Sequence, residues 1–383
     1  MSPFPVLTGM RKAFGVAICA LVLAACSQTP TPTTSHSAGV SPSATQSASP
    51  LPNPSPDTAI SSYGLLLAAG KVEMVNISGK VAASAPFQPA SSLKCADNAP
   101  AAMQPSVSAS ADRVYFRDGD TRIRSLTFDG HTADVTSVPG GASTVSFFSV
   151  SPDDTRIAVL VETFTPNYIA ERLYVEDLAA SLHHVDIYST TTPNNSSGRT
   201  LWPAGWHQGR LVLAVMPVCA KDLSSLSPIE WHVSDAATGK RLATITRSCT
   251  QGNLGILGRW PSAAGIVCTA ATYPAIYNLA GEQTAAFNAL APGADVTGGE
   301  LSPGGNQFFF TRPGLSYEVT VSPWGGVSST TGREPCLWID EHHLLAPDSV
   351  IPLPLGPSYV PPAAIPTPLA VAGVCAGRYP GGL

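Results

Sequence analysis

The chain has 383 residues, of which 12% are charged, and its formal net charge is −5. This mild negative balance, with no cluster of Lys and Arg, excludes the basic surface that nucleic-acid binding requires. The 33 Gly and 36 Pro residues favour many short strands joined by tight turns.

The first 26 residues have the organisation of an export signal. Arg11 and Lys12 precede an uncharged, largely apolar run over 13–25, which is shorter than the ~20 residues that span a bilayer. The run ends in Leu23-Ala24-Ala25-Cys26, which resembles the lipobox of bacterial lipoproteins. The resemblance implies a signal peptide over 1–25, a diacylglycerol on the Cys26 thiol and an acylated new amino terminus.

Lipidation predicts a protein held on the extracytoplasmic side of the cell membrane, because two or three acyl chains make attachment stable. Two alternatives are a soluble secreted protein in which Cys26 is incidental and an uncleaved single-span anchor. Met10 is an alternative start, since the segment from Met10 to Cys26 is already a complete signal.

Residues 26–59 are predicted to form the lipidated cysteine and a disordered linker. From Ser27 to Ala59 the chain is mostly Ser, Thr, Pro, Ala and Gln, with Asp57 as its only formally charged side chain. So little apolar surface cannot offset the entropy lost on ordering. The remaining residues, 60–383, are long enough for one large core.

Three segments of this region align without gaps. They are "VSASADRVYF" from Val107, "VSPDDTRIAV" from Val150 and "LSPGGNQFFF" from Leu301. Each has an apolar residue, a serine, a turn of mainly small and polar residues, and three consecutive apolar residues. The apolar triplet is typical of a strand covered on both faces.

Weaker copies carry Trp206, Trp260 and Trp338 before the turn. A ligand cage is one interpretation of these tryptophans, but their recurrence at one repeat position favours packing between repeats. Most copies are followed by a short strand, a turn that usually contains Gly, and a polar strand, which is typical of hairpins. A unit of several strands, repeated every ~40 to 50 residues, predicts an all-β β-propeller. A β-sandwich is the structural alternative, and no helical segments support an alternating βαβ sheet.

The units resemble the WD40-like repeats of TolB-type periplasmic propellers, whose hallmark is a Ser-Pro-Asp-Gly turn before an apolar strand. Ser151-Pro152-Asp153-Asp154 and Ser302-Pro303-Gly304-Gly305 match it loosely. We count seven units, with six or eight as alternatives, and expect the first and last to pair and close the ring. The units start near residues 60, 103, 145, 198, 254, 295 and 335.

Six cysteines follow Cys26, and an even number in an exported chain favours disulfides. We expect Cys336 to pair with Cys375 and Cys219 with Cys249, because each pair falls inside one unit. Cys95 and Cys268 remain as the third pair. No CxxC or other zinc-like spacing occurs, so we expect no metal role for them.

Candidate sites for chemistry are sparse. His184 and Asp186, in His183-His184-Val185-Asp186, share one face of a predicted outer strand and could form a metal or acid–base pair, although a solvated edge strand is the simpler interpretation. The densest titratable cluster, Asp340-Glu341-His342-His343, is expected to be a polar turn and is the first place to look for a hydrolytic or metal site. Asp118-Gly119-Asp120 could offer oxygens to calcium but is a common hairpin turn.

The sequence lacks GxSxG, GxGxxG and GxxxxGK[ST], so we expect no catalytic residue of those types and no cofactor. It therefore favours a membrane-anchored binding scaffold, whose propeller engages a protein, peptide or glycan, over an enzyme. The alternatives are a propeller hydrolase or lyase acting on envelope or extracellular glycans and a sensory or assembly partner of a membrane complex. A glycosidase would need two converging carboxylates in its main pocket.

Overall fold

Twenty-seven strands and no helix make up the described part of the chain. The computed structural model describes residues 62–104, 106–178, 184–220, 228–245, 261–269, 274–286, 297–311, 317–321, 327–330, 335–353, 362–366 and 374–381. The chain divides into two units, Met1–Pro56 and Asp57–Leu383, and all described residues belong to the second. Within these ranges no helix has the length and apolar character needed to cross a membrane.

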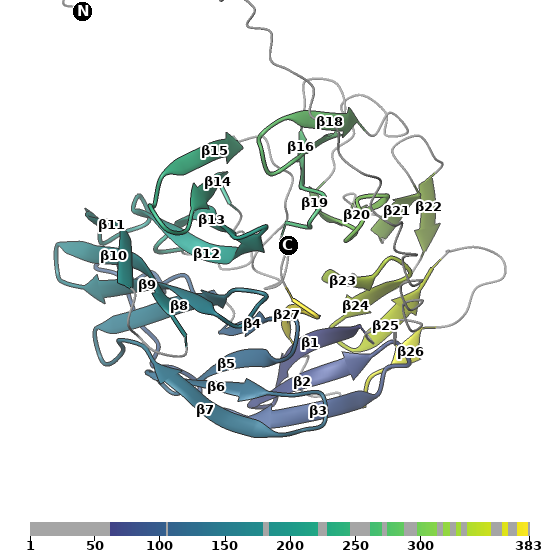
Figure 1. Cartoon of the computed structure of the whole chain (residues 1–383), viewed down its shortest axis with the longest axis horizontal. Helices are drawn as coiled ribbons and strands as arrows, with labels where there is room; N and C mark the ends of the chain where they lie inside the picture. Colours follow the sequence, from purple (N-terminus) through teal and green to yellow (C-terminus); the bar gives the residue numbers. More distant parts are fainter. Residues whose placement is uncertain are drawn as a thin grey trace, which may run out of the picture. The chain divides into compact units, whose positions relative to one another are not determined.

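The strands of the second unit form seven antiparallel sheets, arranged as the blades of a β-propeller (Figure 1). Two of the four-stranded blades are β27 (Val374–Tyr379), β1 (Tyr63–Ala68), β2 (Lys71–Asn76), β3 (Val81–Pro86), and β4 (Val107–Ala109), β5 (Val114–Asp118), β6 (Arg122–Leu126), β7 (Thr132–Ser137). The next two are β8 (Thr144–Val150), β9 (Arg156–Phe164), β10 (Tyr168–Asp177), β11 (His184–Pro193), and β12 (Arg199–His207), β13 (Arg210–Pro217), β14 (Glu230–Asp235), β15 (Arg241–Ile245).

The remaining sheets complete the set. Two have four strands: β19 (Thr297–Leu301), β20 (Gln307–Thr311), β21 (Tyr317–Val321), β22 (Val327–Thr330), and β23 (Leu337–Asp340), β24 (His343–Ala346), β25 (Ser349–Pro352), β26 (Ala363–Ala364). One has three strands in the described ranges: β16 (Ile266–Thr269), β17 (Pro274–Tyr277) and β18 (Gln283–Ala286). The predicted all-β propeller is thus confirmed, with six four-stranded blades and this three-stranded sheet.

The ring closes through the two ends of the propeller unit, as the sequence predicted. Strand β27, near the C-terminus, pairs antiparallel with β1 and is the innermost strand of the first blade. It also lies against β4 of the following blade and β23 of the preceding one. This pairing covers the edge of β1, which would otherwise be free to pair with another chain.

A serine at the end of the innermost strand explains the repeated sequence motif. The buried hydroxyl of Ser151 accepts a hydrogen bond from the backbone N–H of Arg156 (2.9 Å), and Ser302 accepts one from Gln307 (3.1 Å). In the first copy Ser110 makes the corresponding bond, with Arg113 (3.1 Å), two residues after Ser108, which the alignment had put at this position. The turn therefore satisfies its own backbone and sends the chain back along the blade.

The apolar triplets after these turns form the middle of each blade. Phe308, Phe309 and Phe310 of β20 are each 0% exposed, and Val114, Tyr115 and Phe116 of β5 are equally enclosed. Alternate side chains of a strand point to opposite faces, so both faces of these sheets are covered by neighbouring blades.

Two of the repeated tryptophans link adjacent blades. The indole of Trp206 in β12 donates to the carbonyl of Ser149 in β8 (3.1 Å), and Trp338 in β23 donates to Glu300 in β19 (2.9 Å). Both indoles thus pack between blades, which is the interpretation that the sequence favoured. Trp260 lies outside the described residues.

The disulfides agree with one predicted pair and contradict the other two. Cys336, just before β23, is bonded to Cys375 in β27, so a covalent link reinforces ring closure as expected. Cys95 is bonded to Cys219, with 6.2 Å between their Cα atoms. The predicted pairs Cys219–Cys249 and Cys95–Cys268 are therefore wrong. Cys268 is also disulfide-bonded, and Cys249 lies outside the described residues.

The reason for the error lies in a segment between β3 and β4. Leu93–Ala102 runs beside the end of β13, where the N–H of Ala102 donates to the carbonyl of Val218 (2.9 Å) and that of Ala220 to Pro100 (3.1 Å). This connection brings Cys95 to Cys219 across 124 residues of sequence. Division of the chain into repeats cannot reveal such a contact.

Candidate functional site

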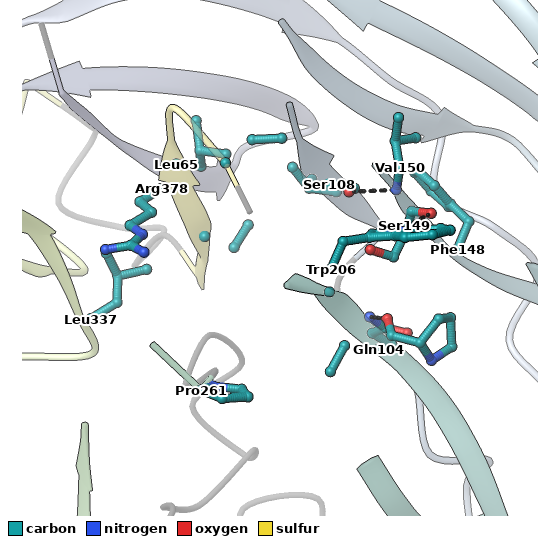
Figure 2. Close-up of a pocket in the computed structure, with 18 of the residues that line it drawn as sticks. Leu65, Gln104, Ser108, Phe148, Ser149, Val150, Trp206, Pro261, Leu337 and Arg378 are labelled. Atoms are coloured by element: carbon teal, nitrogen blue, oxygen red, sulfur yellow. Dashed lines mark hydrogen bonds between the residues drawn. The ribbon is translucent and has the colours of Figure 1, made fainter. Parts of the chain in front are cut away.

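The innermost strands enclose a central cavity of about 80 Å³. Figure 2 shows Arg378 and Trp206 on opposite sides of it, with Ser108, Ser149 and Val150 along the wall. Small residues, including Ala109, Ala204, Gly205, Ala376 and Gly377, supply much of the remaining lining. Because ~10–15 Å³ holds one water, the space suits a few waters or the tip of one side chain.

Several polar atoms in the cavity wall are paired with other segments of the propeller. The Ser108 hydroxyl accepts a hydrogen bond from the N–H of Val150 (2.9 Å; Figure 2), and the Gln104 side chain donates to the carbonyl of Pro203 (2.9 Å). With the bond from Trp206, these contacts join the innermost strands of different blades, and Gln104 adds the connection before β4. Hydrogen bonds of this kind hold the wall in one arrangement.

The cavity contains one carboxyl and one guanidinium among its described lining residues, Glu300 and Arg378. Burial lowers the pKa of Arg378, while the negative charges of Glu300 and Glu341 oppose that change. The pair therefore compensates charge within the cavity. Two converging carboxyls of the kind a glycosidase uses do not line this cavity in the described part of the chain.

At one end the cavity meets a wider hollow of about 460 Å³, which we call the axial mouth. Its lining includes the turn residues Pro152, Pro303 and Glu341 and the C-terminal residues Pro380 and Gly381. Arg378 lines both spaces. The mouth thus consists of the first turns of several blades, the turns that carry the repeated Ser-Pro motif.

Neighbouring turns at the mouth are hydrogen-bonded to one another. The N–H of Ala111 donates to the carbonyl of Pro152 (2.9 Å), and that of Gly381 donates to Ser110 (2.7 Å). A carboxylate oxygen of Glu341 accepts the N–H of Gly304, and its backbone carbonyl accepts the Gln307 side chain (2.6 Å). These contacts fix the relative positions of the turns, so the mouth is organised before any partner arrives.

The predicted titratable cluster lies at this mouth. Asp340 and His343 flank the β23–β24 turn and contact each other (Nδ1 to Oδ1, 2.9 Å), while the N–H of His342 donates to Asp340 (2.7 Å). Hydrogen bonds from His342 and His343 hold the pKa of Asp340 below its usual value, although burial opposes them. The cluster is therefore the polar turn that the sequence favoured.

The other two candidates also have structural partners. His184 and Asp186 lie on the outermost strand β11 and contact each other, as predicted (Nε2 to Oδ1, 3.0 Å). Arg172 donates to Asp186 (2.8 Å), and the His184 ring stacks on Tyr174. His183 lies outside the described residues. In the β5–β6 hairpin, Asp118 accepts the N–H of Gln88 (2.7 Å) and Asp120 accepts that of Ser91 (2.7 Å). Over the residues that the structure describes, no group of three or more His, Cys, Asp or Glu is arranged for a metal ion.

A further pair of titratable residues was missed by the sequence analysis. Glu162 of β9 and Glu171 of β10 are directly opposite in the strand register, and they are only 0% and 3% exposed. Their sequence signal is weak but present: each occupies a position whose neighbours two residues away are apolar, Leu160 and Phe164 around Glu162, Ile169 and Leu173 around Glu171. Both glutamates therefore point to a buried face.

Comparisons with known proteins assign neither a family nor a function to the chain. No protein-family model and no curated protein matches the chain. Similar solved structures include an oligogalacturonate lyase in complex with manganese, with 11% identity, a TM-score of 0.39 and coverage of 62% of this chain and 66% of that one. Prolyl oligopeptidase B from Galerina marginata has 9% identity and a TM-score of 0.35 over 68% of this chain and 38% of that one.

A third similar structure is a complex of KlAtg21 with the coiled-coil of AgAtg16, with 9% identity and a TM-score of 0.40 over 79% of this chain and 99% of that one. The chain thus spans 66% of the lyase and 38% of the peptidase. At such low identity these likenesses assign no substrate or partner to it.

Proposed function

We propose that the protein is a lipid-anchored, extracytoplasmic binding protein whose axial mouth engages a protein, peptide or glycan partner. The lipobox-like sequence ending at Cys26 and the polar linker to Ala59 support the anchor and the tether. The mouth supports the binding role, because turns from several blades meet there and hydrogen-bond to one another. A surface organised in this way loses little conformational entropy on binding.

The alternative is an enzyme acting on glycans. It would require an acid and an ionised base or nucleophile on either side of the scissile bond. The central cavity has Glu300 and no second carboxyl among its described lining residues. The two carboxyls of the described mouth lining, Asp340 and Glu341, are engaged by His343 and by the N–H of Gly304. Glu162 and Glu171 are adjacent on one sheet face, and both have raised pKa values, so neither is well suited as an ionised nucleophile.

Site-specific photocrosslinking in the intact cell envelope tests the mouth. A photoreactive phenylalanine replaces exposed His342 or Asp112 in the mouth turns, or exposed Tyr168 after the β9–β10 turn. Tyr168 is the matched control, because it lies at the opposite end of β9 from the mouth turn. We expect the same partner to be crosslinked from His342 and Asp112 but not from Tyr168.

Crosslinks to that partner from Tyr168 alone would contradict the proposal, and so would release of reducing ends when the purified protein is incubated with envelope glycans. The anchor is tested separately by metabolic labelling with a fatty-acid analogue. The wild type should take the label and Cys26→Ala should not. A labelled Cys26→Ala protein would overturn lipidation without affecting the binding proposal.

A further inference from the structure

The buried pair Glu162–Glu171 has too few hydrogen-bond donors. Tyr188 of β11 donates to one oxygen of Glu171 (3.1 Å). Neither oxygen of Glu162 accepts a hydrogen bond from the described chain, nor does the second oxygen of Glu171. Buried carboxyl oxygens without donors are costly, so three such atoms side by side call for an explanation.

Two other hydroxyls of the described residues lie near the pair: that of Thr190, which is exposed and stands opposite Glu171 in the β10–β11 register, and that of Thr200. Thr200 of β12, which is 2% exposed, faces the pair from the next blade. Its hydroxyl lowers the pKa of both glutamates, but a hydroxyl has a single proton to donate. Thr200 cannot satisfy three carboxyl oxygens, and its own oxygen makes no hydrogen bond of good geometry among the described residues.

Burial raises the pKa of both glutamates. Burial, together with the charge of Glu171, raises the pKa of Glu162 to about 8. Burial raises the pKa of Glu171 to about 7, against the influence of Tyr188 and Thr200. Burial also raises the pKa of Tyr188, which therefore stays a neutral donor. Near neutral pH the pair retains protons that a bound cation could displace.

The pair adjoins a cleft of about 450 Å³ between β10–β11 and β12–β14, which we call the interblade cleft. Glu171, Tyr188 and Thr200 line its inner end, and Glu162 lies beside Glu171. Its walls include the apolar side chains of Ile187, Leu201, Leu213 and Val215. The volume lies within the range of small-molecule sites, which are mostly apolar with a few polar groups.

Charged groups of both signs line the cleft besides Glu171, namely Arg199, Arg241 and Glu230. Arg199 donates from Nη1 to the carbonyls of Ser196 and Gly198, which engages it locally. Glu230 contacts Nε2 of His232, whose pKa is lowered by burial, with Arg241 adding to that effect. The Nδ1 atom of His232, a residue 4% exposed, has no hydrogen-bond partner in the described ranges. A second polar group is thus unpaired along the same cleft.

We propose that the interblade cleft binds a primary ammonium group carried on an aliphatic chain, with the ammonium against Glu171 and Thr200 and the chain along Leu201, Leu213 and Val215. The three N–H donors of an ammonium match the shortage of donors at the carboxyl pair. The apolar walls match an alkyl stem. A divalent metal fits less well, because no three His, Cys, Asp or Glu side chains among the described residues are arranged to hold one ion.

A lysine side chain of a partner and a small diamine share this chemistry. Isothermal titration calorimetry on the purified full chain compares Nα-acetyl-lysine methylamide with 1,5-diaminopentane at pH 6, 7 and 8. The Nε-acetylated lysine amide is the control ligand, because it keeps the stem but has no charge. We expect the charged ligands to bind, about tenfold more tightly at pH 8 than at pH 6, with release of about one proton at pH 7. Tighter binding of the lysine amide would assign the site to a partner's lysine, and tighter binding of the diamine to a free amine.

Substitutions locate the site. Glu171→Gln should weaken binding at least tenfold, and Glu162→Gln should weaken it less but remove the proton release. Glu73→Gln is the matched control, since Glu73 of β2 is a partly buried glutamate with a raised pKa on another blade. Glu162→Gln replaces a buried acid by a neutral side chain of the same size, so loss of folding should not obscure its result.

Several results would overturn the proposal. They are no heat from either amine between pH 6 and pH 8, equal binding of the acetylated control, unchanged affinity in Glu171→Gln, and equal weakening by Glu73→Gln. Binding of Ca²⁺ or Mn²⁺ alone that Glu171→Gln abolishes, with no binding of amines, would assign the pair to a metal instead.

Discussion

The cavity wall and the interblade cleft bury polar groups in opposite ways. In the wall, Ser108, Gln104 and Trp206 each have a backbone partner on another segment of the propeller. In the cleft, Glu162 has none among the described residues, and Glu171 has one for its two oxygens. In the wall these polar groups link segments of the propeller, although Gln104 Oε1 is unpaired among the described residues, whereas in the cleft three carboxyl oxygens are unpaired. Buried ionisable groups without hydrogen-bond partners, such as those of the cleft, are typical of sites that bind a ligand or catalyse a reaction.

The largest expected effect concerns the wall itself. Cys336→Ser combined with Cys375→Ser removes the bond that ties β27 to the segment before β23. The disulfide closes a loop of 39 residues and so reduces the conformational entropy of the unfolded chain. Its removal should lower the free energy of unfolding by about 4 kcal/mol. Denaturant unfolding of oxidised wild type and variant measures it. An unchanged transition midpoint would show that strand pairing between β1 and β27 alone holds the ring closed.

The cleft should make stability depend on pH in an unusual direction. Since the folded state holds the Glu162 and Glu171 protons more tightly than the unfolded chain, folding binds protons between about pH 4.5 and pH 8. Stability contributed by the neutral pair is therefore present at low pH and lost as pH rises through this window. Relative to Glu162→Gln, the wild type should lose roughly 3 kcal/mol from pH 5 to pH 8, since each pKa unit corresponds to ~1.4 kcal/mol.

Urea unfolding of both proteins at pH 5, 6, 7 and 8 measures this difference. The comparison with Glu162→Gln is essential, because carboxylates with lowered pKa values, such as Asp153 and Asp186, lose their stabilising effect in the acidic range in both proteins. Parallel pH profiles for wild type and variant would show that the pair titrates normally.

The mouth turns can be tested at a glycine with no room for a side chain. Gly305 has a φ of +76°, and an added Cβ would lie 2.5 Å from the Cβ of Ala264. Gly305→Ala should cost about 2–3 kcal/mol, from strain and overpacking together. Gly119→Ala is the control, since Gly119 has a φ of +71° but open space around it, and it should cost only about 1 kcal/mol. Equal losses of thermal stability would show that the mouth turn can adjust freely.

The smallest effect compares two tryptophans of one strand. Both Trp202 and Trp206 of β12 are 0% exposed, but only Trp206 has a hydrogen-bond acceptor among the described residues. Phe at either position removes similar volume, yet Trp206→Phe also leaves the Ser149 carbonyl without its donor. It should therefore be more destabilising than Trp202→Phe by about 1 kcal/mol. Equal unfolding free energies for the two variants would show that the hydrogen bond from Trp206 to Ser149 contributes nothing to stability.

Local chemistry predicted more of the fold than of the candidate sites. The serine turns at Ser151 and Ser302 satisfy their own backbone, so they leave a readable pattern, and the apolar triplets follow from burial on both faces. In the first copy the turn serine is Ser110, not the aligned Ser108. The predicted starts of most units fall within a few residues of the first strand of each sheet. Near residue 254 the described chain resumes only at Pro261, and β16 begins at Ile266.

The sequence alone could not predict contacts that depend on strand register or on a segment that runs beside another blade. The pair Glu162–Glu171 exists because β9 and β10 align in one register, and a shift of one residue would turn both side chains to the other face. The Cys95–Cys219 bond depends on a connection that leaves its own blade to run beside β13. Spacing along the chain carries no information on either arrangement.

The most direct test of this contrast is an NMR titration of the glutamate side-chain carboxyl carbons, with Glu162→Gln and Glu171→Gln used for assignment. The account predicts that Glu162 titrates near pH 8 and Glu171 near pH 7, and that 1,5-diaminopentane lowers both values. Titration of both carboxyls near pH 4.5, unaffected by the amine, would contradict it.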